Sequence, residues 1–200
     1  MKLYVVFAAA AAATAMIGAA MAADSDQFLI RGDATKGMLE QNMLNVATAE
    51  KIAQACVADA KKENVKVSIA IMDQFGEPIY FYRMDGQGKA NIDTAFMKAK
   101  TVLNTRQPSK ATMNGVLQGR SSELRQYSFG NFANSGGLPI VINGNQFVGA
   151  IGVGGSAPRV PVWSDEVCAW RALNQVMGKQ PDLLPDVRPA AQGAPAGGRG

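Results

Sequence analysis

Apolar side chains recur at alternating steps of three and four residues in three stretches of the chain, which is the spacing of one helix face. These stretches consist of Val46, Ala49, Ala53, Cys56 and Ala60, of Ile92, Ala95, Phe96, Ala99, Val102 and Leu103, and of Ala169, Ala172, Leu173 and Val176. Asn45 is a suitable cap for the first helix, and the third is expected to begin at Ser164 and to end at Gly178. The pattern therefore predicts three amphipathic helices.

Between these helices, apolar and polar residues alternate in two pairs of short segments, which indicates β-strands. Residues 65–72 and 79–84 flank a turn that begins at Asp73, a residue that favours turns by bonding its own backbone. Residues 138–142 and 146–153 flank Asn143-Gly144, a strong hairpin signal. The order helix, hairpin, helix, hairpin, helix predicts an α+β fold in which helices cover an antiparallel sheet.

The N-terminal segment has the composition of a secretory signal peptide. Lys2 is followed by an alanine-rich apolar run to Gly18 and by the small residues Ala20-Met21-Ala22. A membrane anchor is the alternative, but the run is short and alanine-rich for a span of about 20 strongly apolar residues. We therefore expect a signal peptide over 1–22, cleavage after Ala22, and a periplasmic or secreted mature protein.

Composition divides the remaining chain into three parts. Residues 23–43 form a polar lead-in and 44–178 a single domain. Residues 179–200 form a Pro- and Gly-rich tail, which is expected to be disordered because few apolar side chains remain to stabilise it. Within the domain, residues 106–135 lack a clear period and are expected to form one or two short helices in a mobile, polar connection.

Composition also excludes several classes of chemistry. The sequence has no histidine, so neither Ser-His-Asp nor Cys-His catalysis is available, nor is imidazole ligation of a metal or of haem iron. The net charge of +4 is small and its basic residues are not clustered, which argues against nucleic-acid binding. Cys56 and Cys168 have two equally natural states, a disulfide in an oxidising compartment or two buried thiols on apolar helix faces. No metal site is expected.

Two groups of residues are candidates for a ligand site. Pairing the second hairpin about its turn brings five glycines to one end of the sheet: Gly136, Gly137, Gly152, Gly154 and Gly155. Backbone could approach a ligand closely there; the alternative is close packing of a helix on the sheet, or a bulge. Arg83, Asp85 and Lys98 could converge on an anionic ligand, or Arg83 and Asp85 could pair across their turn with Lys98 in solvent.

Several motifs in a fixed order carry a family resemblance. They are the run VSIAIMD at 67–73, Arg83-Met84-Asp85-Gly86, Lys98-Ala99, GGLPI at 136–140, VGAIGVGG at 148–155 and Asp165-Glu166. Together they resemble the GlcG/HbpS family, which includes the C-terminal domain of PduO-type proteins, over about residues 44–173.

The resemblance implies a profilin-like fold with a five-stranded antiparallel sheet flanked by helices, usually in homo-oligomers. Some members of the family bind or degrade haem, one exported member works with a membrane sensor, and others accompany glycolate or diol catabolism. This sequence departs from the family at Gly154, where serine is usual, and at 157–163, which is longer and proline-rich. Without histidine it also lacks the imidazole that part of the family uses for haem iron, so Tyr, Met, Cys or a hydroxyl would have to serve.

Three functions follow as hypotheses. The favoured one is an exported protein that binds haem or a small organic anion, at a site formed by Arg83, Asp85, Lys98, Gly136, Gly137, Gly152, Gly155 and Asp165. The second is an enzyme acting on a small catabolic metabolite, with Lys98, Asp85 or Asp165 as acid or base. The third is an accessory protein that binds a membrane sensor or a catabolic enzyme.

Overall fold

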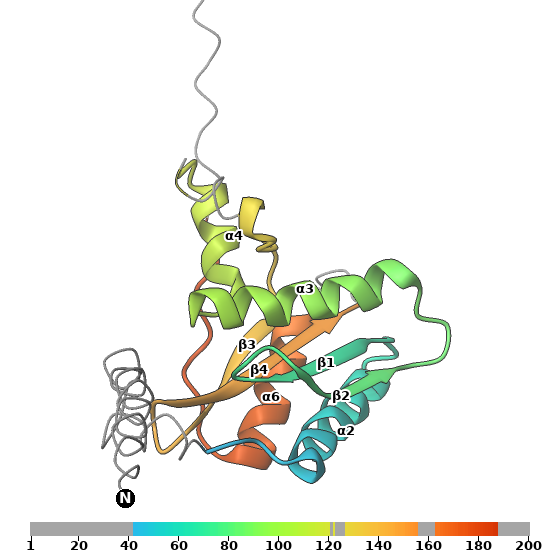
Figure 1. Ribbon diagram of the computed structural model, residues 1–200. Coiled ribbons are helices and arrows are strands. Elements are labelled where there is room, and N and C mark those ends of the chain that lie inside the picture. The colour runs from blue at the N-terminus through green and yellow to red at the C-terminus, as the bar shows by residue number, and fades with distance from the viewer. Residues whose placement is uncertain (1–41, 121, 123–126, 156–162, 188–200) are drawn as a thin grey trace, which may run out of the picture. The chain divides into compact units, whose positions relative to one another are not determined.

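A computed structural model (Figure 1) describes residues 42–120, 122, 127–155 and 163–187 of the chain. The predicted signal peptide, most of the predicted lead-in and residues 188–200 of the predicted tail lie outside the described residues. Of the proline-rich stretch at 157–163, only Trp163 is described.

In the described ranges, four strands form one antiparallel sheet in the order β2-β1-β4-β3. β1 (Ser68–Asp73) and β2 (Pro78–Arg83) form the first predicted hairpin, and β3 (Gly137–Ile142) and β4 (Gln146–Gly154) form the second. The hairpins join through β1 and β4, which pair antiparallel. The α+β class is therefore confirmed. Among the described residues the sheet has four strands and not the five implied by the resemblance, because four described segments have strand alternation. These four strands do not establish a profilin-like fold.

Helices cover both faces of this sheet (Figure 1). α2 (Val46–Lys62) and α6 (Asp165–Met177) pack together on one face, and α3 (Lys89–Thr105) crosses the other. In the part of the chain that the structure describes, no helix is both long enough and apolar enough to span a membrane.

The larger hydrophobic core lies between the sheet and the α2–α6 pair. Ile69 of β1 and Ile151 of β4 pack there against Leu173 of α6, and all three are buried. On the opposite face, Met72 packs against Val102 of α3. All six residues of β1 are buried because helices cover the strand on both sides.

Local signals in the sequence act as predicted at three places. The side chains of Asn45 and Ser164 cap α2 and α6, each accepting a hydrogen bond from the backbone N–H three residues later, at 2.8 and 3.2 Å. Asn143 and Gly144 both have positive φ, 51° and 88°, as a two-residue type I′ turn requires. Asp73 Oδ1 accepts two backbone N–H groups of its turn, both at 2.9 Å.

The connection between α3 and β3 contains α4 (Ser109–Leu117) and the 3-10 helix η2 (Tyr127–Phe129). Hydrogen bonds to buried side-chain hydroxyl groups hold its described parts in place. Ser109 Oγ donates to the carbonyl of Asn134 at 2.6 Å and accepts the N–H of Gly137 at 2.9 Å. Thr101 Oγ1 accepts the N–H of Phe132 at 2.7 Å. The short-helix prediction is confirmed, and these polar contacts hold the connection against α3 and β3.

Residues 179–187 pack on the domain, although the sequence predicts a disordered tail there. The side chain of Gln180, which is 4% exposed, donates to the carbonyl of Val141 at 3.1 Å and accepts its N–H at 3.3 Å. The Asn114 amide donates to the carbonyl of Pro185 at 3.0 Å. The prediction of disorder does not hold for these nine residues, because polar contacts to backbone groups hold the segment and Leu183 packs against the core.

β3 is an edge strand whose outward backbone N–H groups, at Gly137 and Val141, have side-chain partners. Val141 bonds Gln180 through both its N–H and its carbonyl, and the N–H of Gly137 donates to Ser109. Between them Pro139 has no N–H to offer, which is the usual place for proline in a sheet. A row of unpaired donors is thereby avoided along this edge.

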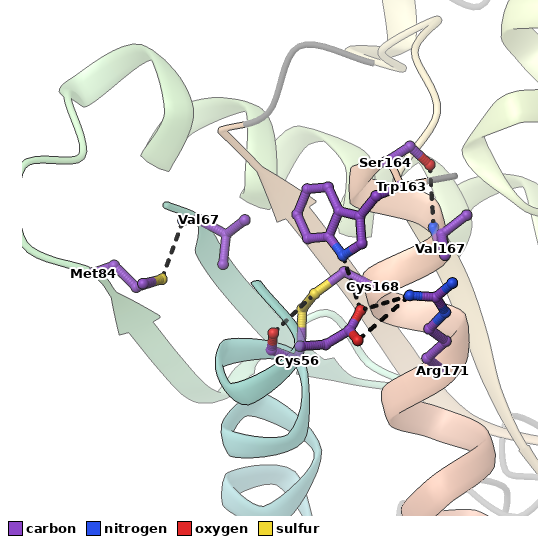
Figure 2. The surroundings of a disulfide bond; sticks show 9 residues. Cys56, Val67, Met84, Trp163, Ser164, Val167, Cys168 and Arg171 are labelled. Carbon is purple, nitrogen blue, oxygen red and sulfur yellow. Dashed lines mark hydrogen bonds and ion pairs between the residues drawn. A yellow bond between two sulfur atoms is a disulfide. The ribbon is translucent and has the colours of Figure 1, made fainter. Parts of the chain in front are cut away.

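A disulfide bond between Cys56 and Cys168 joins α2 to α6 (Figure 2). The two Cα atoms are 5.1 Å apart and both residues are fully buried. Of the two alternatives left open by the sequence, the structure has the disulfide. Asp59 of α2 lies beside it, accepting the indole N–H of Trp163 at 2.8 Å and pairing with Arg171 at 3.3 Å.

Candidate functional site

The predicted glycines meet at one end of the sheet, where α3 packs on them. A Cβ atom on Gly152 would lie 2.0 Å from the carbonyl oxygen of Ala95, and one on Gly137 would lie 2.5 Å from that of Lys98. Real Cβ atoms essentially never come so close to backbone, so a side chain at either position would push α3 off the sheet. Close helix-on-sheet packing, one of the two interpretations of these glycines, therefore describes Gly137 and Gly152.

Gly136 and Gly155 are needed for their backbone conformation as well, with φ of 113° and 138°. A Cβ atom on Gly136 would lie 2.8 Å from that of Asp165 and 2.9 Å from Lys98 Nζ. One on Gly155 would lie 2.6 Å from the carbonyl oxygen of Lys66. Both glycines are thus surrounded by protein atoms at close range.

Lys98 and Asp165 form a buried ion pair at this end of the sheet. Lys98 Nζ donates to Asp165 Oδ2 at 2.7 Å and to the carbonyl of Val153 at 2.8 Å. The two side chains are 4% and 8% exposed. The pair joins α3 to the first turn of α6, so the Lys98 ammonium is neutralised within the fold.

Arg83 and Gly154 both pair with Ser68 of β1, so Arg83 and Asp85 lie at the same end of the sheet as the glycines but on the far side of β1. Both are exposed, at and just after the end of β2, and β1 and β4 separate that strand from β3. In the described part of the chain they form no ion pair with each other or with Lys98. The structure therefore brings Lys98, Asp165 and Gly136 into contact, whereas Arg83 and Asp85 lie at the same end of the sheet on the β2 side of β1.

A cavity of about 600 Å³ lies beside the edge strand β3. Its wall is mostly apolar and comes from the turn after β1, the end of α3, the second hairpin, α6 and the segment after α6. We call it the Trp170 cavity; its wall includes Gln74, Arg106, Leu138, Phe147, Trp170 and Gln180. The indole N–H of Trp170 donates to the carbonyl of Pro181 at 3.0 Å, which fixes the ring against the segment after α6.

Two donors in this wall are suited to an anion. Arg106 ends α3 with φ of 58°, and its guanidinium carbon lies 4.1 Å from the centroid of the Phe147 ring. Among the described residues no carboxylate lies within ion-pair distance of Arg106, although the exposed Asp182 belongs to the same wall. Gln74 Nε2 is buried and has no hydrogen-bond partner among the residues that the structure describes. A guanidinium and an amide N–H are the groups that bind a carboxylate, and the apolar wall suits an apolar ligand body.

A second cavity of about 490 Å³ lies between α4, the first turn of α6 and residues 183–187. We call it the α4–α6 cleft; its wall includes Lys110, Met113, Asn114, Glu166, Leu183 and Pro185. Lys110 Nζ lies 3.3 Å from Glu166 Oε2 and 2.6 Å from Asp186 Oδ1. The cleft therefore combines apolar side chains with one ammonium and two carboxylates.

Burial and neighbouring charges shift the pKa values of Glu166 and Lys110 in this cleft. It raises the pKa of the Glu166 carboxyl above its ordinary value, and the Lys110 ammonium offsets this only in part. Burial alone would lower the pKa of Lys110, but the carboxylates of Asp186 and Glu166 outweigh it and the pKa is raised. Glu166 Oε1 and Asn114 Oδ1 are buried acceptors without a hydrogen-bond partner in the described part of the chain.

The sequence pattern does not single out Gln74, Arg106, Lys110 or Asn114, and Glu166 enters only through the Asp165-Glu166 motif of the family resemblance. Arg106 follows the predicted second helix, so the sequence pattern places it near a helix end. Nothing local indicates that Lys110 and Glu166 meet, because they lie on different helices far apart in the chain. Long-range packing alone brings these residues together.

The residues of the Trp170 cavity do not fit a ligated haem iron. Proteins hold haem iron through histidine, cysteine, methionine or tyrosine. This chain has no histidine, and Cys56 and Cys168 are joined to each other. The wall of the Trp170 cavity contributes no methionine or tyrosine. Within the described ranges, no group of three or more Cys, Asp or Glu side chains is placed to hold a metal ion.

Comparisons with known proteins agree with the family resemblance. GlcG of Escherichia coli strain K12 is 32% identical over 119 residues, which cover 60% of this chain and 83% of GlcG. The crystal structure of a double mutant of HbpS from Streptomyces reticuli has a TM-score of 0.61 at 28% identity, covering 74% of this chain and 94% of that one. A structure described as a PduOC:heme complex shares the fold, with a TM-score of 0.57 at 20% identity over 66% of this chain and 94% of that one.

The family model described as "Haem degrading protein HbpS-like" matches residues 44–174. This match includes both hairpins, α3, α4 and most of α6. The resemblance seen in the sequence motifs is therefore confirmed, and the chain belongs to the HbpS-like family.

Proposed function

We propose that this protein binds a small organic anion in the Trp170 cavity. The observation that carries the proposal is the Arg106 guanidinium, which lines a mostly apolar cavity with no carboxylate in ion-pair contact among the described residues. A buried donor without a partner, such as Gln74 Nε2, costs on the order of 1–3 kcal/mol, which a bound carboxylate would offset. The ligand class is therefore a carboxylate with an apolar body.

The cation that binds the anionic ligand is Arg106 and not Lys98, which the sequence predicts for this role. Lys98 already donates to Asp165 and to a backbone carbonyl. The family description supports an apolar ligand, because haem is an apolar ring that carries carboxylates. Haem in this cavity would be held through those carboxylates, without an iron ligand from the wall.

Calorimetric titration of the mature protein with 3-phenylpropionate tests the proposal. Arg106→Met is expected to weaken binding about 10- to 100-fold, the scale of a hydrogen bond to a charged group. Arg83→Met is the matched control, because it removes an exposed arginine at the other edge of the sheet and should leave the affinity unchanged. Equal affinity of the Arg106→Met variant, or of the neutral alcohol 3-phenylpropanol, would contradict the proposal.

Haemin provides a separate arm of the same titration. A Soret shift at micromolar concentration that Arg106→Met abolishes would assign haem to the Trp170 cavity. Absence of a shift would leave smaller carboxylates as the ligand class.

We further propose that the protein is exported and processed after Ala22. The leader composition motivates this, and the disulfide supports it because such bonds persist in oxidising compartments. Intact mass of the protein from a periplasmic fraction is expected to correspond to a chain starting at Ala23. Recovery of the full 21.1 kDa chain from the cytoplasm would refute export.

A further inference from the structure

The α4–α6 cleft contains two buried oxygen atoms that accept no hydrogen bond from any described residue. Glu166 is 2% exposed and Asn114 is 8% exposed. The Asn114 amide nitrogen donates to the carbonyl of Pro185, which leaves Oδ1 as the unpaired atom. Glu166 Oε2 faces Lys110, which leaves Oε1. Buried acceptors of this kind are costly, and a ligand that brings hydrogen-bond donors would satisfy them.

The charges in the cleft favour a cation over a neutral ligand. One ammonium, Lys110, is shared between two carboxylates, and its 2.6 Å contact with Asp186 is shorter than its 3.3 Å contact with Glu166. Glu166 is therefore the less well compensated carboxylate, and the three groups together carry a charge of −1 when both carboxylates are ionised. The neighbouring pair of Lys98 and Asp165 adds no net charge.

The rest of the wall suits an apolar body. Met113 and Leu117 of α4, Val167 of α6 and Leu183 and Leu184 line the cleft around its polar groups. A small ion with its hydration shell would not use these side chains, whereas an organic cation would.

We propose that the α4–α6 cleft is a second ligand site, for a protonated primary amine with an apolar body. The ammonium donates to Glu166 Oε1, and Asn114 Oδ1 is a second acceptor for its N–H groups on the same wall. The apolar body packs on Met113 and Leu183. The raised pKa of Glu166 agrees with this assignment, because a bound cation would favour the charged carboxylate that burial disfavours.

Calorimetric titration of the mature protein with benzylammonium tests the second site. Benzylammonium is expected to bind at least about tenfold more tightly than benzyl alcohol or 1,2-propanediol, because only the amine carries the compensating charge. Glu166→Gln, which keeps the shape of the side chain, is expected to weaken benzylammonium at least about tenfold. The control is Glu50→Gln, an exposed carboxylate of α2, which should change nothing.

A second measurement does not depend on the variant folding. The methyl carbon of Met113 in the unmodified protein is expected to shift in NMR spectra on addition of benzylammonium. The same signal should stay in place on addition of 3-phenylpropionate, so failure of one site is distinguishable from failure of the other. The proposal is overturned if the alcohol or the diol binds as well as the amine, or if Glu166→Gln retains full affinity. It is also overturned if millimolar benzylammonium neither binds nor moves the Met113 signal.

Discussion

Replacement of both Cys56 and Cys168 by alanine is expected to lower the free energy of unfolding by about 4 kcal/mol. The bond links residues separated by 112 positions, and a cross-link that closes a loop of that length removes much of the entropy of the unfolded chain. Both cysteines are fully buried between α2 and α6, so the alanine variant also loses packing there. Denaturant unfolding followed by circular dichroism measures the change.

A reductant provides the control for this expectation. Unfolding in its presence should destabilise the unmodified protein and leave the double-alanine variant unchanged. An unfolding midpoint of the unmodified protein that does not respond to the reductant would contradict a structural role of the disulfide. The loss is large because a domain of this size is usually stable by only about 5–15 kcal/mol.

Lys98→Met is expected to cost about 3 to 5 kcal/mol of stability, because it removes the ammonium that pairs with the buried Asp165 carboxylate. Methionine keeps most of the lysine stem, so the change removes chiefly the charge and the two hydrogen bonds of Nζ. The double variant with Asp165→Asn is expected to be more stable than Lys98→Met alone, since a neutral amide is less costly to bury than a carboxylate that has lost its lysine.

Lys100→Met is the matched control in the same helix, because Lys100 is exposed and should change stability by less than about 0.5 kcal/mol. An unchanged melting temperature for Lys98→Met would show that the pair contributes little to folding. Lys98 would then be available again as the ligand-binding cation that the sequence predicts.

The sequence predicts the elements of this fold well, because their signals are local. The cap at Asn45, the turn at Asn143-Gly144 and the turn at Asp73 each need only a few neighbouring residues, and each forms as expected. The apolar stripe of the last helix likewise needs no partner to be recognised. The strand count was the exception, since it came from the family and not from a pattern in this chain.

The candidate sites could not be predicted in the same way, because their residues meet only through tertiary packing. Lys98 and Asp165 were both singled out, yet nothing in their spacing indicates that they neutralise each other. The glycines were correctly placed at one end of the sheet, but sequence alone could not decide whether a ligand or α3 lies against Gly152. Arg106 carries no sign in the sequence that it lines a cavity.

The covered edge at β3 has a consequence for how copies of this protein could assemble. Another strand could add beside Val141 only by displacing the Gln180 side chain, and Pro139 would offer it no donor. A homo-oligomer that extends the sheet from one molecule to the next would therefore have to grow from β2, the opposite edge. If only the β2 edge can pair, sheet extension stops at a dimer in which two β2 strands lie side by side. The sheet therefore cannot propagate into a fibre while Gln180 stays in place.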